Sequence, residues 1–337
     1  MREALFYKKT EHHEVQCGLC PHYCRIKEKQ RGICGVRENI DGVLQSLVYG
    51  KVVASHVDPI EKKPLFHFLP GSYSFSIATA GCNFRCDFCQ NWQISMAPRE
   101  YKIIPGENWN PEEVVAEAVE RECQSISYTY TEPTVYFEFA LDCAKLARAR
   151  GLKNVFVTNG FTSPEAVRLV APFLDAANID LKSFREEYYR KICGGSLAPV
   201  IASIKLIKEL GIWIELTTLV IPGLNDSAQE LQGIAEFIKN ELGEGVPWHV
   251  SAFFPTHKML DRLPTPEETL VRAREIGLTA GLQHVYCGNL LVPEAANTYC
   301  GHCGKTVITR SGHRVTSSEI KDGQCAFCGH NLPGVFR

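Results

Sequence analysis

Between residues 72 and 290, strand-like segments alternate with helical ones, and this alternation leaves few folds open to the chain. Strands are expected at 72–80, 125–130, 154–158, 176–181, 213–220 and 249–254. Helices are expected between them, at 111–121, 134–150, 164–170, 200–210, 227–242 and 266–282. Strands separated by helices form βαβ units with a parallel sheet. We therefore predict an α/β fold with a full or partial β/α barrel of the TIM type. A doubly wound open sheet is the alternative, but no glycine-rich phosphate loop follows the first strand.

Cysteine-bearing segments flank this region. Eleven of the fifteen cysteines fall into three clusters, and Cys123, Cys143, Cys193 and Cys287 stand alone. In a chain of 337 residues without a signal sequence, clustered cysteines indicate metal sites rather than disulfides. Three parts are predicted: an N-terminal four-cysteine module over 1–70, the barrel over 71–295, and a zinc-ribbon-like tail over 296–337.

Cys82, Cys86 and Cys89 lie in the loop after the first expected strand, with the spacing C-x3-C-x2-C. Gly81 ends that strand, so the loop lies at its C-terminal end, where α/β barrels carry their chemistry. Four thiolates would close a zinc site or a cubane. Three leave one iron of a [4Fe–4S] cluster free to chelate a small molecule and pass it an electron. A zinc knuckle without its fourth ligand, or unrelated thiols in a turn, are the alternatives.

Polar residues collect at the C-terminal ends of the later strands. Glu132 follows the second strand, Thr158 and Asn159 end the third, and the fourth carries Asp180 and Lys182. Residues two apart on a strand point to the same side. A charge inside a barrel strand is costly unless it is paired or bound to something. We therefore predict that Asp180 and Lys182 bind a ligand at the barrel mouth, with a structural ion pair as the alternative.

The cysteine spacing, with the aromatic Phe88 before the last cysteine, resembles the signature of the radical S-adenosylmethionine (SAM) superfamily. Over nearly its whole length, the chain also resembles activating enzymes of glycyl radical enzymes, and more narrowly the AmmeMemoRadiSam system radical SAM enzymes. The resemblance implies that a [4Fe–4S] cluster on the three cysteines reductively cleaves SAM. The resulting 5′-deoxyadenosyl radical would abstract hydrogen from a substrate that the sequence does not identify.

The resemblance also implies contacts to SAM. Phe88 would pack by the adenine, Glu132 would bind the methionine amino group, and Thr158 with Asn159 would contact the ribose. Asp180 and Lys182 would contact the methionine end, and His249 the adenosine. Thr131-Glu132-Pro133 departs from the family's usual two glycines and an acid. A buried strand histidine is also commonly structural, so His249 keeps both interpretations.

The flanking clusters predict further metal sites. Cys300, Cys303, Cys325 and Cys328 form two C-x2-C knuckles around a strand-like 307–309, which is typical of a zinc ribbon. A rubredoxin-like iron or a docking module for a protein substrate are the alternatives. Cys17, Cys20, Cys24 and Cys34 can close one site for zinc or for a second [4Fe–4S] cluster, with His22 as a substitute ligand, and spacing does not decide between them. The segment 61–64 is expected to be a solvated turn.

Charge and hydropathy exclude some classes of function. A net charge of −2 disfavours a broad nucleic-acid surface. No apolar run reaches the roughly 18 residues of a membrane helix, and the first ten residues carry no apolar signal core. We therefore expect no membrane segment and a cytoplasmic location.

Three substrates compete for a radical SAM enzyme: a backbone glycine of a partner enzyme, a side chain of a protein or peptide, and a small metabolite. The resemblance implies pathway partners of the Memo-like and AMMECR-type families, and an external electron donor such as flavodoxin or ferredoxin. A non-catalytic zinc-ribbon binding protein and a simple iron–sulfur electron carrier are the alternatives from other classes.

Overall fold

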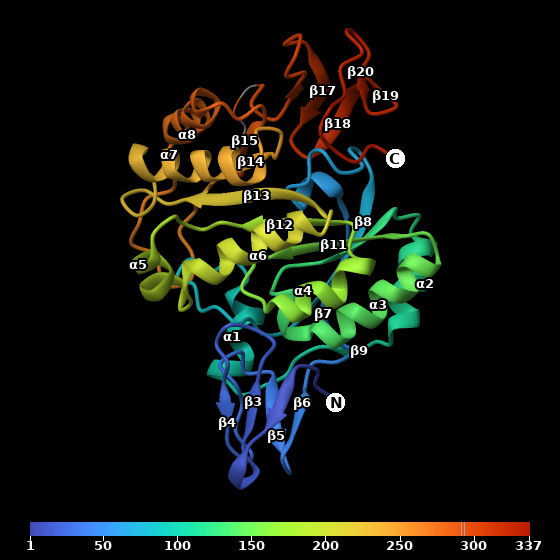
Figure 1. Ribbon diagram of the computed structural model, residues 1–337, viewed down its shortest axis with the longest axis vertical. Coiled ribbons are helices and arrows are strands. Elements are labelled where there is room, and N and C mark those ends of the chain that lie inside the picture. The colour runs from blue at the N-terminus through green and yellow to red at the C-terminus, as the bar shows by residue number, and fades with distance from the viewer. Residues whose placement is uncertain (291, 293) are drawn as a thin grey trace.

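The computed structural model describes residues 1–290, 292 and 294–337, and its centre is a nine-stranded sheet (Figure 1). The strand order is β15-β14-β13-β12-β11-β10-β8-β7-β9. Seven consecutive strands are parallel: β8 (Tyr73–Thr79), β10 (Ser125–Tyr128), β11 (Lys153–Thr158), β12 (Ala176–Asp180), β13 (Trp213–Val220), β14 (Trp248–Ala252) and β15 (Val285–Gly288). This arrangement confirms the predicted α/β fold as a partial barrel.

Helices follow the strands as expected. They are α2 (Pro111–Glu120), α3 (Phe137–Ala149), α4 (Pro164–Val170), α6 (Leu197–Glu209), α7 (Ala228–Phe237) and α8 (Glu267–Ala280). The start of α2 shows why local sequence sets these bounds. The Asn110 side chain accepts from the backbone N–H of Glu113, the Glu113 side chain accepts from that of Asn110, and Pro111 occupies the first helical position.

The structure adds elements that the sequence patterns do not predict, and two of them adjoin the predicted barrel strands and the cysteine loop. The strand β15 extends the parallel sheet beyond β14, and α1 (Trp92–Glu100) directly follows the cysteine loop. Pro98 lies inside α1. Because proline is disfavoured in the interior of a helix, the sequence does not indicate a helix at this position. The expected helix 227–242 also changes form, because its last five residues, Ile238–Leu242, form a π-helix.

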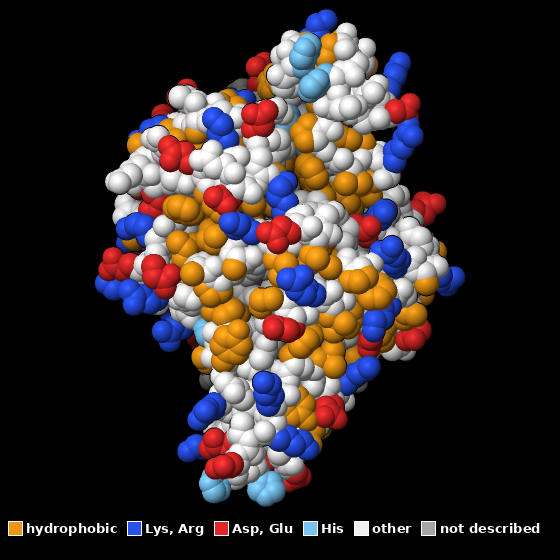
Figure 2. Space-filling model, viewed as in Figure 1, with side chains coloured by type: hydrophobic (Ala, Val, Ile, Leu, Met, Phe, Trp, Pro, Cys, Tyr) orange, Lys and Arg blue, Asp and Glu red, His pale blue; other side chains and the backbone are white. Residues whose placement is uncertain are grey.

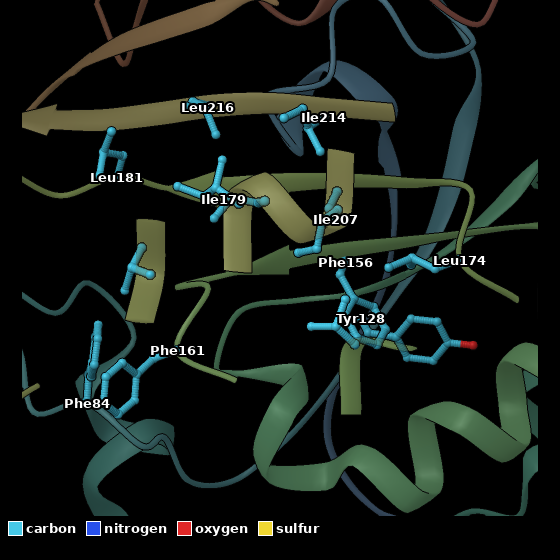
Figure 3. Close-up of a cluster of buried hydrophobic side chains, with 14 of the residues drawn as sticks. Phe84, Tyr128, Phe156, Phe161, Leu174, Ile179, Leu181, Ile207, Ile214 and Leu216 are labelled. Atoms are coloured by element: carbon cyan, nitrogen blue, oxygen red, sulfur yellow. The ribbon is translucent and has the colours of Figure 1, made fainter. Parts of the chain in front are cut away.

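The two faces of the parallel strands differ in polarity, as strand alternation requires. Figure 3 shows Phe156, Ile179 and Ile214 in one buried cluster with Ile207 of α6, between the sheet and its helices. The opposite, inner face carries polar side chains. On that face Thr217 Oγ1 donates to Asn178 Oδ1 at 2.9 Å. The inner face is therefore the surface that can hold a polar ligand.

The N-terminal residues form two small antiparallel sheets at one end of the molecule (Figure 1). One consists of β2 (Tyr7–Lys9), β3 (Val15–Cys17) and β4 (Arg25–Ile26). The other consists of β1 (Arg2–Glu3), β6 (Val43–Ser46) and β5 (Arg37–Ile40). The following strands, β7 (Lys51–Pro59) and the short β9 (Glu107–Asn108), extend the central sheet antiparallel to β8 and β7 respectively. The domain bounds at 70 and 295 stay predictions.

The C-terminal residues lie at the other end of the molecule (Figure 1). They form β16 (Thr298–Tyr299), β17 (Thr306–Ser311) and β18 (Arg314–Ser318), followed by the hairpin β19 (Ile320–Lys321) and β20 (Gln324–Cys325). Arg310 Nη2 donates to the Phe66 carbonyl at 2.7 Å, which ties this tail to the barrel.

The expected solvated turn at 61–64 is wrong. Glu61 and Lys63 are both buried. Lys63 Nζ donates to Asp58 Oδ2 at 2.6 Å, and Glu61 Oε1 accepts from the Gly71 backbone N–H at 2.9 Å. These charged residues are buried because the fold gives each of them a polar partner, which local polarity alone does not predict.

The surface is mixed in charge. Figure 2 shows Lys and Arg side chains interspersed with Asp and Glu over the face in view. Of the helices in the described part of the chain, none is both long and apolar enough to cross a membrane.

Candidate active site and metal centres

The loop with Cys82, Cys86 and Cys89 follows β8 at the C-terminal edge of the parallel strands. Backbone hydrogen bonds hold it from the side of β12: Arg85 N donates to the Cys193 carbonyl at 2.8 Å, and Asp87 N to the Ile192 carbonyl at 3.2 Å. Residues 192 and 193 end the helical turn Tyr189–Cys193. The loop is thus fixed by segments that are distant in the sequence.

Gly81 is required where the loop begins. Its φ is +102°, and a Cβ at this position would lie 2.6 Å from Val36 Cγ1 and 3.3 Å from the Cys34 carbonyl oxygen. A side chain would therefore meet both an unfavourable backbone conformation and a close contact. The N-terminal module consequently packs directly against the start of the cysteine loop.

The ends of β10 and β11 meet beside Cys82. Glu132 is buried and accepts hydrogen bonds from the backbone N–H and hydroxyl of Thr134, the hydroxyl of Thr158 and the backbone N–H of Asn159, at 2.7–3.0 Å. Burial raises the pKa of Glu132, and these donors oppose that rise. Asn159 Nδ2 lies 3.8 Å from Cys82 Sγ. The structure therefore brings three of the predicted SAM contacts to the cysteine loop, and the contacts to SAM themselves stay predictions.

Asp180 and Lys182 form an ion pair at the end of β12. Lys182 Nζ lies 2.7 Å from Asp180 Oδ2 and 5.8 Å from the centroid of the Phe88 ring. Burial alone would lower the pKa of Lys182, but the Asp180 carboxylate and the thiols of Cys86 and Cys193 raise it well above its usual value. The pair thus presents a fixed ammonium and a partly exposed carboxylate beside the loop, whether or not they contact SAM.

The chemistry of the three thiols fits a cationic metal core. Burial raises the pKa of Cys82 well above its usual value and that of Cys89 to about 11. The pKa of Cys86 rises through a hydrogen bond with Cys193 and through burial. Metal ligation requires thiolates, and a metal core supplies the positive charge that deprotonates them. The described residues place no three ligand atoms of this loop within 4.8 Å of one another, so the loop is not arranged around a single ion.

His249 lies in a buried network. Its Nε2 is 2.7 Å from Glu215 Oε2, and its ring packs edge-on against Phe66 and parallel to Tyr286. Glu215 also accepts from the backbone N–H groups of Phe66 and His67, at 2.9 and 2.7 Å. His249 therefore has a structural role in anchoring residues 66 and 67 inside the barrel, and its predicted contact with adenosine stays a prediction.

Two groups near the site were missed from the sequence. Cys193 was left unassigned, and only the fold brings its thiol to Cys86. Asp58 accepts from Tyr130 at 2.5 Å as well as from Lys63, and Lys63 Nζ lies 4.6 Å from the centroid of the Tyr130 ring. Burial lowers the pKa of Lys63 to about 8, although Asp58 opposes this. The only sequence signal here is the polarity of segment 61–64, which by itself favours a solvent-exposed turn.

The tail cysteines form a preorganised metal site. Cys300, Cys303, Cys325 and Cys328 place all four sulfurs within 4.8 Å of one another. The Cys300–Cys328 and Cys303–Cys325 sulfur pairs are 3.7 and 3.8 Å apart. A tetrahedral zinc site with Zn–S bonds of about 2.3 Å has sulfurs about 3.8 Å apart. The geometry therefore fits the predicted zinc ribbon, and the identity of the metal stays a prediction.

A parallel partial barrel with a three-cysteine loop after its first parallel strand defines a class of iron–sulfur enzyme that binds SAM. The family model of the radical SAM superfamily matches residues 76–238. An uncharacterised protein of Methanocaldococcus jannaschii is 45% identical over 334 residues, which cover 98% of this chain and 99% of that protein. The chain belongs to the radical SAM superfamily, and this membership implies a [4Fe–4S] cluster and SAM.

More distant matches agree with this assignment. The pyruvate formate-lyase-activating enzyme of Clostridium pasteurianum is 22% identical over 179 residues, covering 50% of this chain and 72% of that enzyme. The structure of Streptococcus suis SuiB bound to its precursor peptide SuiA superposes with a TM-score of 0.51 at 15% identity, covering 69% of this chain and 52% of SuiB. The SuiB likeness concerns the fold alone. The chain is a radical SAM enzyme related to activating enzymes of glycyl radical enzymes.

Proposed function

We propose that the chain cleaves SAM reductively and directs the 5′-deoxyadenosyl radical to abstract hydrogen from a substrate, in the manner of a glycyl-radical-enzyme activase. The cluster on Cys82, Cys86 and Cys89 would supply the electron and the open iron. One observation carries this proposal: the fold gathers the Asp180–Lys182 pair, Asn159 and the cysteine loop at one edge of the sheet.

The protein's own residues would position SAM and protect the radical. The ammonium of Lys182 and the carboxylate of Asp180 match the carboxylate and amino groups at SAM's methionine end in charge. Their short ion pair holds both side chains in place before binding, which lowers the cost of ordering them. Phe88 is buried in the same loop and offers an apolar surface. A solvent-poor site of this kind would keep the radical from water.

The narrower assignment is to the AmmeMemoRadiSam system, with Memo-like and AMMECR-type proteins as pathway partners and flavodoxin or ferredoxin as the electron donor. It is supported by the resemblance over nearly the whole chain, including the flanking cysteine clusters. A protein or peptide substrate is favoured over a small metabolite by the relation to activating enzymes, which are named for the enzymes that they activate. The cytoplasmic location belongs to the same proposal.

The test is anaerobic reconstitution with iron and sulfide, addition of SAM and dithionite, and quantification of 5′-deoxyadenosine. Wild type should form it, and Cys86→Ala should fall to the background of the protein-free reaction. Cys123→Ala is the matched control, since it removes a buried thiol from outside the three clusters, and it should match wild type. A wild-type protein that binds zinc but neither iron nor SAM would overturn the proposal and leave a zinc-binding protein.

A further inference from the structure

The four N-terminal cysteines surround a cavity. Cys17 ends β3, and Cys20, Cys24 and Cys34 lie in the loops on either side of β4. All four cysteines line it, together with apolar side chains that include Leu19, Ile26 and Val135. The four thiols thus face one common space.

The sulfur positions differ from those of the tail. Although all four N-terminal cysteines belong to the described part of the chain, no three of their sulfurs come within 4.8 Å of one another. The tail sulfurs of the same molecule stand 3.7 and 3.8 Å apart, at the separation of a single tetrahedral ion. In a cubane each thiolate binds a different iron, so the ligand sulfurs stand farther apart around the core. The N-terminal arrangement agrees with the cubane and disagrees with one zinc ion.

Arg37 adds an independent observation. This residue lines the same cavity and is 1% exposed. Its Nη2 is paired with the Glu138 carboxylate, but its Nε is buried and hydrogen-bonds to no atom in the described residues. A buried donor without an acceptor is costly, and its neighbourhood commonly holds an unseen partner. A sulfide or thiolate of an iron–sulfur cluster in the cavity would accept this hydrogen bond.

His22 also lines the cavity, with its Nε2 2.8 Å from the Asn83 carbonyl. The four cysteines by themselves supply the four thiolates that a cubane needs. We propose that Cys17, Cys20, Cys24 and Cys34 ligate a second [4Fe–4S] cluster. With four thiolates every iron of this cluster has a protein ligand, so it binds no SAM.

The second site adjoins the first. Asn83, which follows the cluster ligand Cys82, also lines the N-terminal cavity. On the other side of Cys82, Gly81 packs against Cys34 and Val36. Two redox centres would thus be neighbours within one molecule. The existence of the second cluster does not depend on the proposed SAM chemistry, and it is tested without it.

The test counts metals in the whole protein after anaerobic reconstitution. Wild type should hold about eight iron and eight sulfide per chain, the content of two cubanes. The triple variant Cys82→Ala/Cys86→Ala/Cys89→Ala should keep about four of each. After dithionite reduction, it should show the electron paramagnetic resonance signal of a reduced cubane, and SAM should leave that signal unchanged. The double variant Cys20→Ala/Cys24→Ala should also hold about four iron, and its signal should respond to SAM.

The control is Cys123→Ala/Cys143→Ala, which removes two buried thiols from outside the clusters and should keep the wild-type iron content. A triple variant without iron, or a second zinc per chain beside that of the tail, would overturn the proposal. If the Cys20→Ala/Cys24→Ala variant does not fold, the iron content of wild type and of the triple variant still decides. Loss of SAM cleavage with both clusters present would count against the proposed function and not against this inference.

Discussion

The buried ion pair between Arg37 and Glu138 gives a quantitative test of how the N-terminal module is held on the barrel. Arg37 belongs to β5 and Glu138 to α3. Arg37 Nη2 donates to both carboxylate oxygens of Glu138, at 2.7 and 2.6 Å, and the two side chains are 2% and 3% exposed. The backbone N–H of Leu5 donates to the same carboxylate at 2.7 Å. Glu138→Gln would remove the carboxylate that pairs directly with the buried guanidinium.

The expected loss follows from that burial. Removing one partner of a buried pair costs about 3–5 kcal/mol, because the other charge stays desolvated. The double variant Arg37→Met/Glu138→Met removes both charges, so it should lose clearly less than the sum of the two single variants. Glu187→Gln is the control, because Glu187 pairs with Lys191 on the surface, with side chains 62% and 71% exposed. That change should leave the melting temperature close to that of wild type, because an exposed ion pair contributes little to stability.

The assay is thermal unfolding of wild type and five variants at equal iron and zinc content: Glu138→Gln, Arg37→Met, Glu138→Met, the double methionine variant and Glu187→Gln. Hydrogen exchange of β5 is the local readout. Glu138→Gln should lower the melting temperature far more than Glu187→Gln and should increase exchange in β5. Equal effects of Glu138→Gln and Glu187→Gln, or single-variant losses that add in the double variant, would refute the reasoning.

Three further outcomes are expected. Gly81→Ala should lower both the free energy of unfolding and the iron content. Gly151→Ala is the control, because Gly151 also has a positive φ but has open space around it, and it should lose only about 1–2 kcal/mol of stability. Equal losses of stability in the two variants would contradict the contact argument. Burial lowers the pKa of His284 to about 4, so between pH 6.5 and 4 the unfolded chain binds a proton that the folded chain does not. Wild type should therefore lose up to about 3 kcal/mol over that range. His284→Leu should show a smaller loss in melting curves, and parallel pH profiles would count against this. Cys300→Ala/Cys303→Ala should remove one zinc per chain and leave iron unchanged, while loss of iron would identify the tail as a rubredoxin-like site.

Local sequence was sufficient for most of the fold. The expected bounds of α4 agree with the structure, and the predicted strands correspond to β8 and to β10 through β14. These elements carry their own signals, such as the Ser163 cap before Pro164 at the start of α4. The strand β15 was missed, although it ends in the turn pair Gly288-Asn289 and is as long as β10, which was predicted.

Contacts between side chains of different elements could not be predicted from local sequence signals. The thiol of Cys193 reaches Cys86 across more than a hundred residues, and the buried Lys63 finds its partners Asp58 and Tyr130 inside the barrel. Polarity alone favoured a solvated position for Lys63. The folded structure places a countercharge beside the buried ammonium, and this pairing offsets the free-energy cost of removing it from water.

The cysteine clusters show the difference between what the sequence determines and what only the folded structure determines. Spacing along the chain determined how many thiols each site offers: three after β8 and four in each flanking cluster. It did not determine how far apart the sulfurs stand, because that distance depends on how loops from different strands pack. The tail brings its sulfurs to the separation of one ion, and the N-terminal module holds its four around a cavity. Spacing therefore determines the number of ligands, and the tertiary structure determines how far apart those ligands stand.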